Sequence, residues 1–212
     1  MEKLQELLTN YNLKYIKDES RNSWSDQYCE SIYPKYWYEV FKVSKSLDTN
    51  LRVLEVGAGQ GDITSVFCYL GFKNIISFER DEKNAKIAQQ KLNHIFSADS
   101  IVKNRAFPTS EKIASDILVL VNCIYADGIN NKEEYKEQIK MIYSMAGSPG
   151  LFMFETIDSE YDIPDDVFPY EVRLSKNDIL DMFPSSEISG IRTYQYPENK
   201  KTKTLYIIKV HK

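Results

Sequence analysis

Hydrophobic and polar positions in the first half of the chain switch between strand-like and helix-like spacing. A buried-strand pattern begins at Leu51, and a second one covers residues 74–78. Between them, apolar residues recur at helical spacing on one face: Ile63, Val66, Phe67 and Leu70. We expect Asp62 to cap this helix and Gly71 to end it. The pattern therefore predicts a strand, a turn, a helix and a second strand in direct succession.

The same alternation continues to the end of the chain. Helices are expected at 81–94, around 135–146 and at 175–183, and strands at 117–121, 151–154, 188–196 and 204–210. The third strand has two possible positions, because 95–98 is short for a strand and 100–107 is an alternative. Alternating strands and helices predict an α/β fold and argue against a second independent domain.

The turn after the first strand carries an acid followed by three alternating glycines: Glu55, Gly57, Gly59 and Gly61. Glycine permits backbone conformations closed to other residues and lets a ligand approach the backbone closely. The second strand ends in Glu79, whose carboxylate can accept hydrogen bonds from a ribose diol. A dinucleotide fingerprint requires a third glycine at position 62, where this chain has Asp, and a carboxylate there would repel a pyrophosphate. The spacing therefore favours a nucleoside cofactor with a cationic tail.

At these residues the sequence resembles the class I S-adenosylmethionine-dependent methyltransferases. The run from Glu55 to Gly61 looks like the first motif of that family, and the final strand pair resembles the end of its sheet. The resemblance covers about residues 50–212. It implies a three-layer, Rossmann-like fold with a mostly parallel seven-stranded sheet whose last strand is antiparallel. Residues 1–49 would then be an N-terminal helical extension or lid.

The resemblance also implies roles in binding S-adenosylmethionine. Glu55 would orient the methionine part of the cofactor while Gly57, Gly59 and Gly61 pass beneath it. Glu79 matches the ribose-binding acid of the family. Asp99 sits where an acidic or polar residue approaches the adenine, provided that the third strand ends near residues 98–100.

Composition agrees with one cytoplasmic domain. The 212 residues suffice for one core, and 27 basic against 31 acidic residues give a net charge of −4, which disfavours nonspecific nucleic-acid binding. Cys29, Cys68 and Cys123 are too few and too far apart for a disulfide framework or a zinc cluster, so no metal is expected. The first eight residues are charged and amphipathic, unlike a signal peptide, and no apolar stretch approaches the roughly 20 residues that span a bilayer.

Candidate acceptor-side residues follow the fourth strand. Asn122 and Tyr125 have the spacing of the Asn-Pro-Pro-Tyr motif of the family, in which an amide and a carbonyl hold an amino group beneath an aromatic ring. Cys123 and Ile124 replace the two prolines, which would have fixed the backbone, so the match is partial. We place Asn122 in the cofactor-binding set and Tyr125 in the catalytic set. Alternatively, Asn122 ends the strand and Tyr125 packs under the loop.

An acidic segment follows the fifth strand. It contains seven carboxylates and no Lys or Arg: Glu155, Asp158, Glu160, Asp162, Asp165, Asp166 and Glu171. Such a segment would repel phosphate and attract an amine, or it is simply a solvated loop. Its aromatic residues make a covering lid an option.

The N-terminal extension concentrates aromatic residues, most of which should pack in the core. Tyr28 and Tyr33 are the candidates for contacting the sulfonium of the cofactor by cation–π attraction.

Methyl transfer requires mainly alignment of acceptor, methyl and sulfur, and exclusion of water. A hydroxyl acceptor benefits from a proton acceptor, for which Asp127 and Glu155 are the candidates. The reading favoured by the sequence is transfer to nitrogen or oxygen of a neutral or cationic small molecule. The alternatives are an RNA or protein N-methyltransferase, and a noncatalytic cofactor-binding domain of the same fold.

Overall fold

The computed structural model of this protein describes residues 1–22, 25, 35–123, 128–161, 164–165, 168–194 and 202–211. Two compact units divide the chain, a first unit of Met1–Ala106 and a second unit of Phe107–Lys212. The expected division into residues 1–49 and 50–212 stays a prediction. No helix among the described residues is long and apolar enough to cross a membrane.

Seven strands of the described chain form one mixed sheet in the order β3-β2-β1-β4-β5-β7-β6. Their bounds are β1 Arg52–Val56, β2 Asn74–Glu79, β3 Val102–Asn104, β4 Ile117–Leu120, β5 Leu151–Thr156, β6 Ser186–Tyr194 and β7 Thr202–Val210. The pairs β1–β2, β2–β3 and β4–β5 are parallel, whereas β7 runs antiparallel to both β5 and β6. The predicted Rossmann-like fold with an antiparallel last strand is confirmed.

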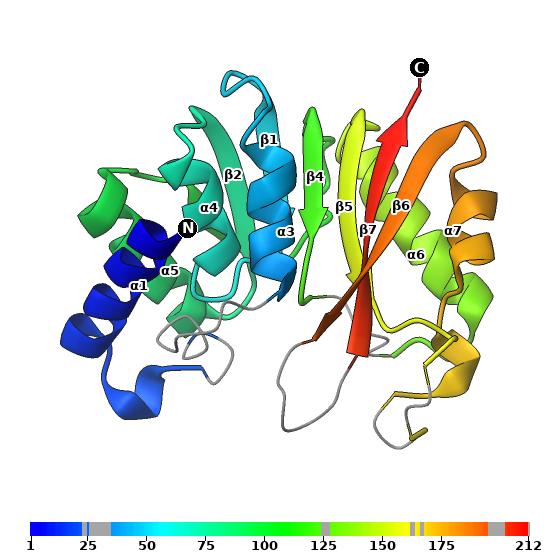
Figure 1. Cartoon of the computed structure of the whole chain (residues 1–212), viewed down its shortest axis with the longest axis horizontal. Helices are drawn as coiled ribbons and strands as arrows, with labels where there is room; N and C mark the ends of the chain where they lie inside the picture. The colour runs from blue at the N-terminus through cyan, green and yellow to red at the C-terminus, as the bar shows by residue number, and fades with distance from the viewer. Residues whose placement is uncertain are drawn as a thin grey trace. The chain divides into compact units, whose positions relative to one another are not determined.

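Helices of the first unit pack beside β1–β3 (Figure 1). They are α1 (Glu2–Tyr15), α3 (Lys35–Ser44), α4 (Asp62–Tyr69) and α5 (Glu82–Phe96), with a 3-10 turn at Asp18–Ser20. Helix α4 contacts α3, α5 and β2, while α5 contacts both β2 and β3. Buried apolar side chains such as Leu54, Val66, Phe78 and Leu92 come from the strands and from the inner helix faces. This packing holds the carboxyl end of β1 and the start of α4 in place.

The second unit carries α6 (Lys132–Met145) and α7 (Lys176–Met182), with a 3-10 turn at Tyr170–Val172. Helix α6 contacts α7, and α7 contacts β6. Helix α7 begins with a capping box, in which the Ser175 side chain accepts from the Asp178 backbone and the Asp178 side chain accepts from the Ser175 backbone. Apolar residues of β4, and those of β5 after Leu151, are buried, as expected for central strands.

Three local predictions are corrected. Helix α5 continues to Phe96 and ends in left-handed Ser97, so 95–98 is not a strand and β3 lies in the alternative stretch, 100–107. Gly61, not Asp62, is the N-cap of α4, and Asp62 is the first helical residue. Strand β5 extends two residues beyond Phe154, so Glu155 belongs to the strand and not to the loop after it.

Candidate functional site

The glycine turn after β1 is folded back against β2. The backbone N–H groups of Gly57 and Ala58 both donate to the Phe78 carbonyl, at 2.8 and 3.0 Å. Gly61 has a φ of +79°, and a Cβ placed on it would lie 3.1 Å from the Ala88 Cβ of α5. Only a residue without a side chain meets both demands readily, because left-handed backbone strains other residues and the neighbouring helix leaves little room.

Glu79 holds this turn through its side chain. Its Oε2 accepts a hydrogen bond from the Gly59 N–H at 2.7 Å, and its Oε1 accepts from the Asp81 N–H at 2.8 Å. The half-buried carboxylate therefore lies between the glycine turn and the N-terminus of α5. This is the carboxyl end of β2, the edge at which open α/β sheets bind their ligands.

Glu55 lies inside the fold beneath the same turn. Its Oε2 accepts hydrogen bonds from Thr64 Oγ1 on α4 and from Ser77 Oγ on β2, the second at 3.3 Å. The residue is 2% exposed, and burial raises the pKa of its carboxyl to about 7, against the lowering effect of the two hydroxyl donors. Nearby Asp62 and Glu79 raise that pKa further. Glu55 therefore exchanges its proton near neutral pH.

Asp62 is the centre of a buried polar cluster. Its Oδ1 pairs with Lys91 Nζ of α5 at 2.8 Å, and its Oδ2 accepts from Ser25 Oγ at 2.8 Å. Its backbone carbonyl accepts from Trp37 Nε1 of α3 at 2.9 Å. Asp62 and Lys91 are 5% and 0% exposed, so the carboxylate is neutralised inside the protein. The acid at position 62 thus joins the N-terminal extension to the glycine turn.

The N-terminal extension makes further hydrogen bonds to the glycine turn and to α5. Gln60 Nε2 donates to the Ser20 carbonyl at 2.8 Å, and Asn22 Nδ2 donates to Asn84 Oδ1 at 2.8 Å. The two candidates for contact with a sulfonium, Tyr28 and Tyr33, lie outside the described residues, so their assignment stays a prediction.

Asp99 lies at the wrong end of β3 for its expected role. It precedes the strand, is exposed, and accepts a hydrogen bond from Asn93 Nδ2. In the parallel register Glu79 pairs with Asn104, so Asn104, and not Asp99, lies beside Glu79 at the carboxyl ends of β2 and β3. Asn104 Nδ2 donates to the Glu79 and Arg80 carbonyls at 3.1 and 3.2 Å. The alternative strand position at 100–107 was the signal that could have led to Asn104.

In the second unit, Glu155 and Asn122 lie side by side at the carboxyl ends of β5 and β4. Glu155 is 1% exposed, and its Oε2 accepts from the Asn122 N–H at 3.1 Å. Its Oε1 accepts from Thr193 Oγ1 at 2.6 Å, and Lys203 Nζ lies 3.7 Å from Oε2. Lys203 Nζ also donates to Asn122 Oδ1 at 2.7 Å. These contacts hold the Glu155 carboxylate in place, and its catalytic assignment stays a prediction. Lys203 and Thr193 were missed because they lie far away in sequence.

The acidic segment after β5 presents fewer free carboxylates than its sequence indicates. Asp158 is buried and accepts from Tyr206 Oη, a hydroxyl whose pKa is raised by burial and that therefore remains a donor. Asp165 pairs with Arg173 at 3.1 Å. Arg173 is 2% exposed and donates through Nε to the Phe168 carbonyl at 2.9 Å.

The same segment also has an apolar core, in which Ile157, Phe168 and Val172 pack together. Its described part is thus built into the second unit, and the expected lid stays a prediction.

Two catalytic candidates, Tyr125 and Asp127, lie outside the described residues. Within the ranges that the structure describes, no group of three or more His, Cys, Asp or Glu side chains could hold a metal ion.

Comparison with curated proteins and with solved structures places methyltransferases among the proteins similar to this chain. No protein-family profile matches the chain. The ubiquinone/menaquinone biosynthesis C-methyltransferase of Wigglesworthia glossinidia brevipalpis is 23% identical over 185 residues, which are 76% of this chain and 73% of that protein.

Among solved structures, the magnesium protoporphyrin IX methyltransferase of Synechocystis PCC 6803 with bound S-adenosylmethionine superposes with a TM-score of 0.60 at 14% identity, covering 97% of both chains. A putative O-methyltransferase from Klebsiella pneumoniae gives a TM-score of 0.56 at 14% identity, over 99% of this chain and 90% of that one. A putative RNA methyltransferase from Pyrococcus horikoshii gives 0.57 at 16% identity, over 97% and 96%. At these identities the solved structures show the shared fold, and they include methyltransferases with different kinds of acceptor.

Proposed function

We propose that this chain, which by fold and sequence similarity belongs to the class I S-adenosylmethionine-dependent methyltransferases, transfers a methyl group to nitrogen or oxygen of a small-molecule acceptor. S-adenosylmethionine is its methyl donor. A cytoplasmic location is part of the proposal and rests on the few, widely spaced cysteines in the sequence.

The observation that carries the proposal is the contact between the Glu79 carboxylate and the glycine turn. A single carboxylate fixes the turn at Gly59 and stands at the carboxyl end of β2, where it can exchange that contact for a ribose diol. Glu55, with a pKa raised to about 7, lies below the same turn, where a cationic amino group would favour its ionised form. The first unit thus supplies an acceptor for the ribose and an acid for the methionine part.

Methyl transfer itself requires little acid–base chemistry. The sulfonium is already a good leaving group, so the chain must align the acceptor atom with the methyl carbon and exclude water. We propose that residues after β4, namely Asn122, Tyr125 and Asp127, contact the acceptor, with Asp127 taking a proton when the acceptor is a hydroxyl. For Glu155, the contacts with Asn122 and Lys203 support a holding role more than proton transfer.

The choice of a small molecule over RNA rests on charge. The net charge is −4, and the chain lacks a long basic run. The acidic segment supports this choice less strongly than its sequence indicates, because Asp158 is buried and Asp165 is paired. Its exposed acids Glu160 and Glu171 still oppose a phosphodiester at that surface.

The proposal is tested by supplying methyl-labelled S-adenosylmethionine with two acceptor pools, a low-molecular-weight metabolite extract and deproteinised RNA. We expect label to enter the metabolite pool at a rate well above a no-enzyme control. RNase-sensitive label in the RNA pool would replace the small-molecule acceptor by RNA and would give the Asn122-to-Tyr125 spacing a role in base recognition. Labelling of added proteins alone would favour the protein-methylating alternative.

A further inference from the structure

Asn122 has an unusual backbone conformation at the point where β4 ends. Its φ is +56°, a left-handed value that few residues other than glycine adopt and that asparagine tolerates better than most. Such conformations persist only where the surroundings hold them, and they concentrate at functional sites. The Asn122 N–H is held by Glu155 Oε2, at 3.1 Å.

The Asn122 side chain is held by a different strand. Lys203, near the start of β7, donates from Nζ to Asn122 Oδ1 at 2.7 Å and lies 3.7 Å from Glu155 Oε2. Thr193 of β6 donates to the other oxygen of Glu155 at 2.6 Å. Residues of β5, β6 and β7 thus fix both the backbone and the side chain of Asn122, two residues after β4.

A buried lysine at this position stabilises the fold little, so packing alone does not explain it. Lys203 is 1% exposed and the Glu155 side chain is fully buried. The free energy needed to remove both charges from water offsets most of the electrostatic attraction between them. An apolar pair would support the sheet at least as well. What an apolar pair cannot do is donate a hydrogen bond to Asn122 Oδ1.

We infer that Lys203 is a positioning residue for the acceptor side, which sets the conformation of Asn122 directly through Oδ1 and indirectly through Glu155. In the family motif that the spacing of Asn122 and Tyr125 resembles, two prolines stiffen the backbone at this point, and here Cys123 and Ile124 stand in their places. The buried Lys203–Glu155 pair supplies the missing rigidity from across the sheet. The importance of Asn122 for methyl transfer rests on the proposed function, whereas its fixation by Lys203 does not.

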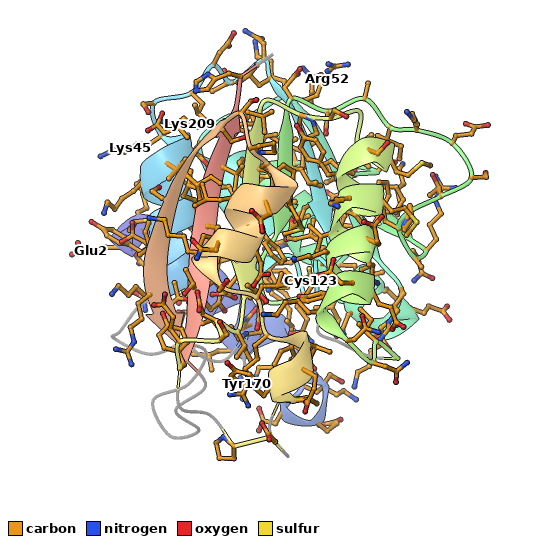
Figure 2. The ribbon with its side chains drawn as sticks, turned by 90° about the vertical axis from the view of Figure 1, so that its right-hand side faces the viewer. Glu2, Lys45, Arg52, Cys123, Tyr170 and Lys209 are labelled. Carbon is orange, nitrogen blue, oxygen red and sulfur yellow. The ribbon has the colours of Figure 1, made fainter. Side chains whose placement is uncertain are left out.

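The test compares Lys203→Met with Lys209→Met. Lys209 lies on the same strand and also pairs with a glutamate, Glu187 of β6, at 3.2 Å, but both of these side chains are exposed. Figure 2 shows Lys209 at the upper end of β7 and Cys123, the neighbour of Asn122, well below it. Lys209→Met is therefore a matched control for loss of a lysine–glutamate pair on β7.

The first readout is the conformation of Asn122, measured by its 13Cα and 13Cβ chemical shifts and its side-chain amide resonances. We expect Lys203→Met to move these signals away from those of the left-handed, hydrogen-bonded residue, and Lys209→Met to leave them in place. Unchanged Asn122 signals in Lys203→Met would overturn the inference, whether or not the enzyme acts on small molecules.

The second readout separates positioning from charge balance. In the double variant Lys203→Met with Glu155→Gln, no buried charge remains unpaired, so the thermal midpoint should recover relative to Lys203→Met alone. We expect transfer from labelled S-adenosylmethionine to the metabolite extract to stay about ten- to a hundredfold below wild type in both variants. Recovery of transfer together with stability would reduce Lys203 to a structural counter-ion and overturn the inference. Absence of transfer by the wild type would refute the proposed function, and the Asn122 signals would then decide the inference alone.

Discussion

Replacing Glu55 by Gln should make the protein more stable at neutral and alkaline pH. Burial raises the pKa of the Glu55 carboxyl from an ordinary value of 4.5 to about 7. Each pH unit between these values corresponds to about 1.4 kcal/mol, so keeping the ionised side chain in the folded protein costs about 3 kcal/mol. Glutamine has nearly the same shape and carries no charge. Both hydroxyl donors, Thr64 and Ser77, bond to the same oxygen of Glu55, so the glutamine carbonyl can accept both bonds.

The sign of the pH dependence follows from proton linkage. Between pH 4.5 and about 7 the folded protein keeps the Glu55 proton, whereas the unfolded chain has lost it. The folded state therefore binds more protons in this window, and the contribution of Glu55 to stability falls as the pH rises. Below pH 4.5 both states are protonated, and the wild type and Glu55→Gln should differ little in free energy of unfolding.

Urea unfolding at pH 4.5, 6 and 8 measures this effect. The stability of Glu55→Gln minus that of the wild type should grow with pH by up to about 3 kcal/mol. Glu187→Gln, at an exposed position on β6, is the control and should stay within about 0.5 kcal/mol of the wild type at each pH. Two results would refute the raised pKa of buried Glu55. One is a stability difference that does not change with pH, and the other is a Glu55→Gln variant that loses stability relative to the wild type between pH 6 and 8.

Three further predictions concern residues of the first unit. Glu79→Ala should weaken binding of S-adenosylhomocysteine by about 1–3 kcal/mol, because charge-assisted hydrogen bonds to the ribose are lost, whereas exposed Glu82→Ala should leave calorimetric affinity unchanged. Gly61→Ala should lower stability more than Gly71→Ala, since both positions have positive φ but only Gly61 has a neighbour, the Ala88 Cβ, within 3.1 Å of an added Cβ. Thermal unfolding measures the stability of both variants, and equal losses of stability would show that Ala88 shifts to make room for the added Cβ. Lys91→Met should cost about 3–5 kcal/mol in urea unfolding, because it leaves the buried Asp62 carboxylate without its cation, and adding Asp62→Asn should recover part of that loss.

Regular apolar spacing accounts for the elements that could be predicted from the sequence. Helix α5 begins within a residue of its predicted start because Asp81 caps it and Ala85, Ala88 and Leu92 form a continuous buried face. Strand β3 was ambiguous because it has three residues and none of them is fully buried, so its sequence carries almost no pattern. The misplacement of Asp99 followed directly from that ambiguity.

Buried charge pairs were the part of the site that local patterns could not provide. Lys91 follows Ala88 on the apolar face of α5, and a lysine there is the one local sign that a carboxylate lies opposite it. Lys203 lies 48 residues from Glu155, and only the pairing of β5 with β7 brings them together. Strand register, which decides such pairs, depends on the complete sheet and not on any one segment.

Calorimetric titration with S-adenosylmethionine, S-adenosylhomocysteine and NAD shows which nucleoside cofactor the glycine turn binds. We expect saturable binding of the first two ligands and much weaker binding of NAD, since α4 begins with Asp62 where a dinucleotide site has its third glycine. Loss of affinity in Glu79→Ala would show that the measured heat comes from binding at the glycine turn. Preferential binding of NAD, or no binding of S-adenosylhomocysteine by folded protein, would contradict the assignment of this chain as a methyltransferase.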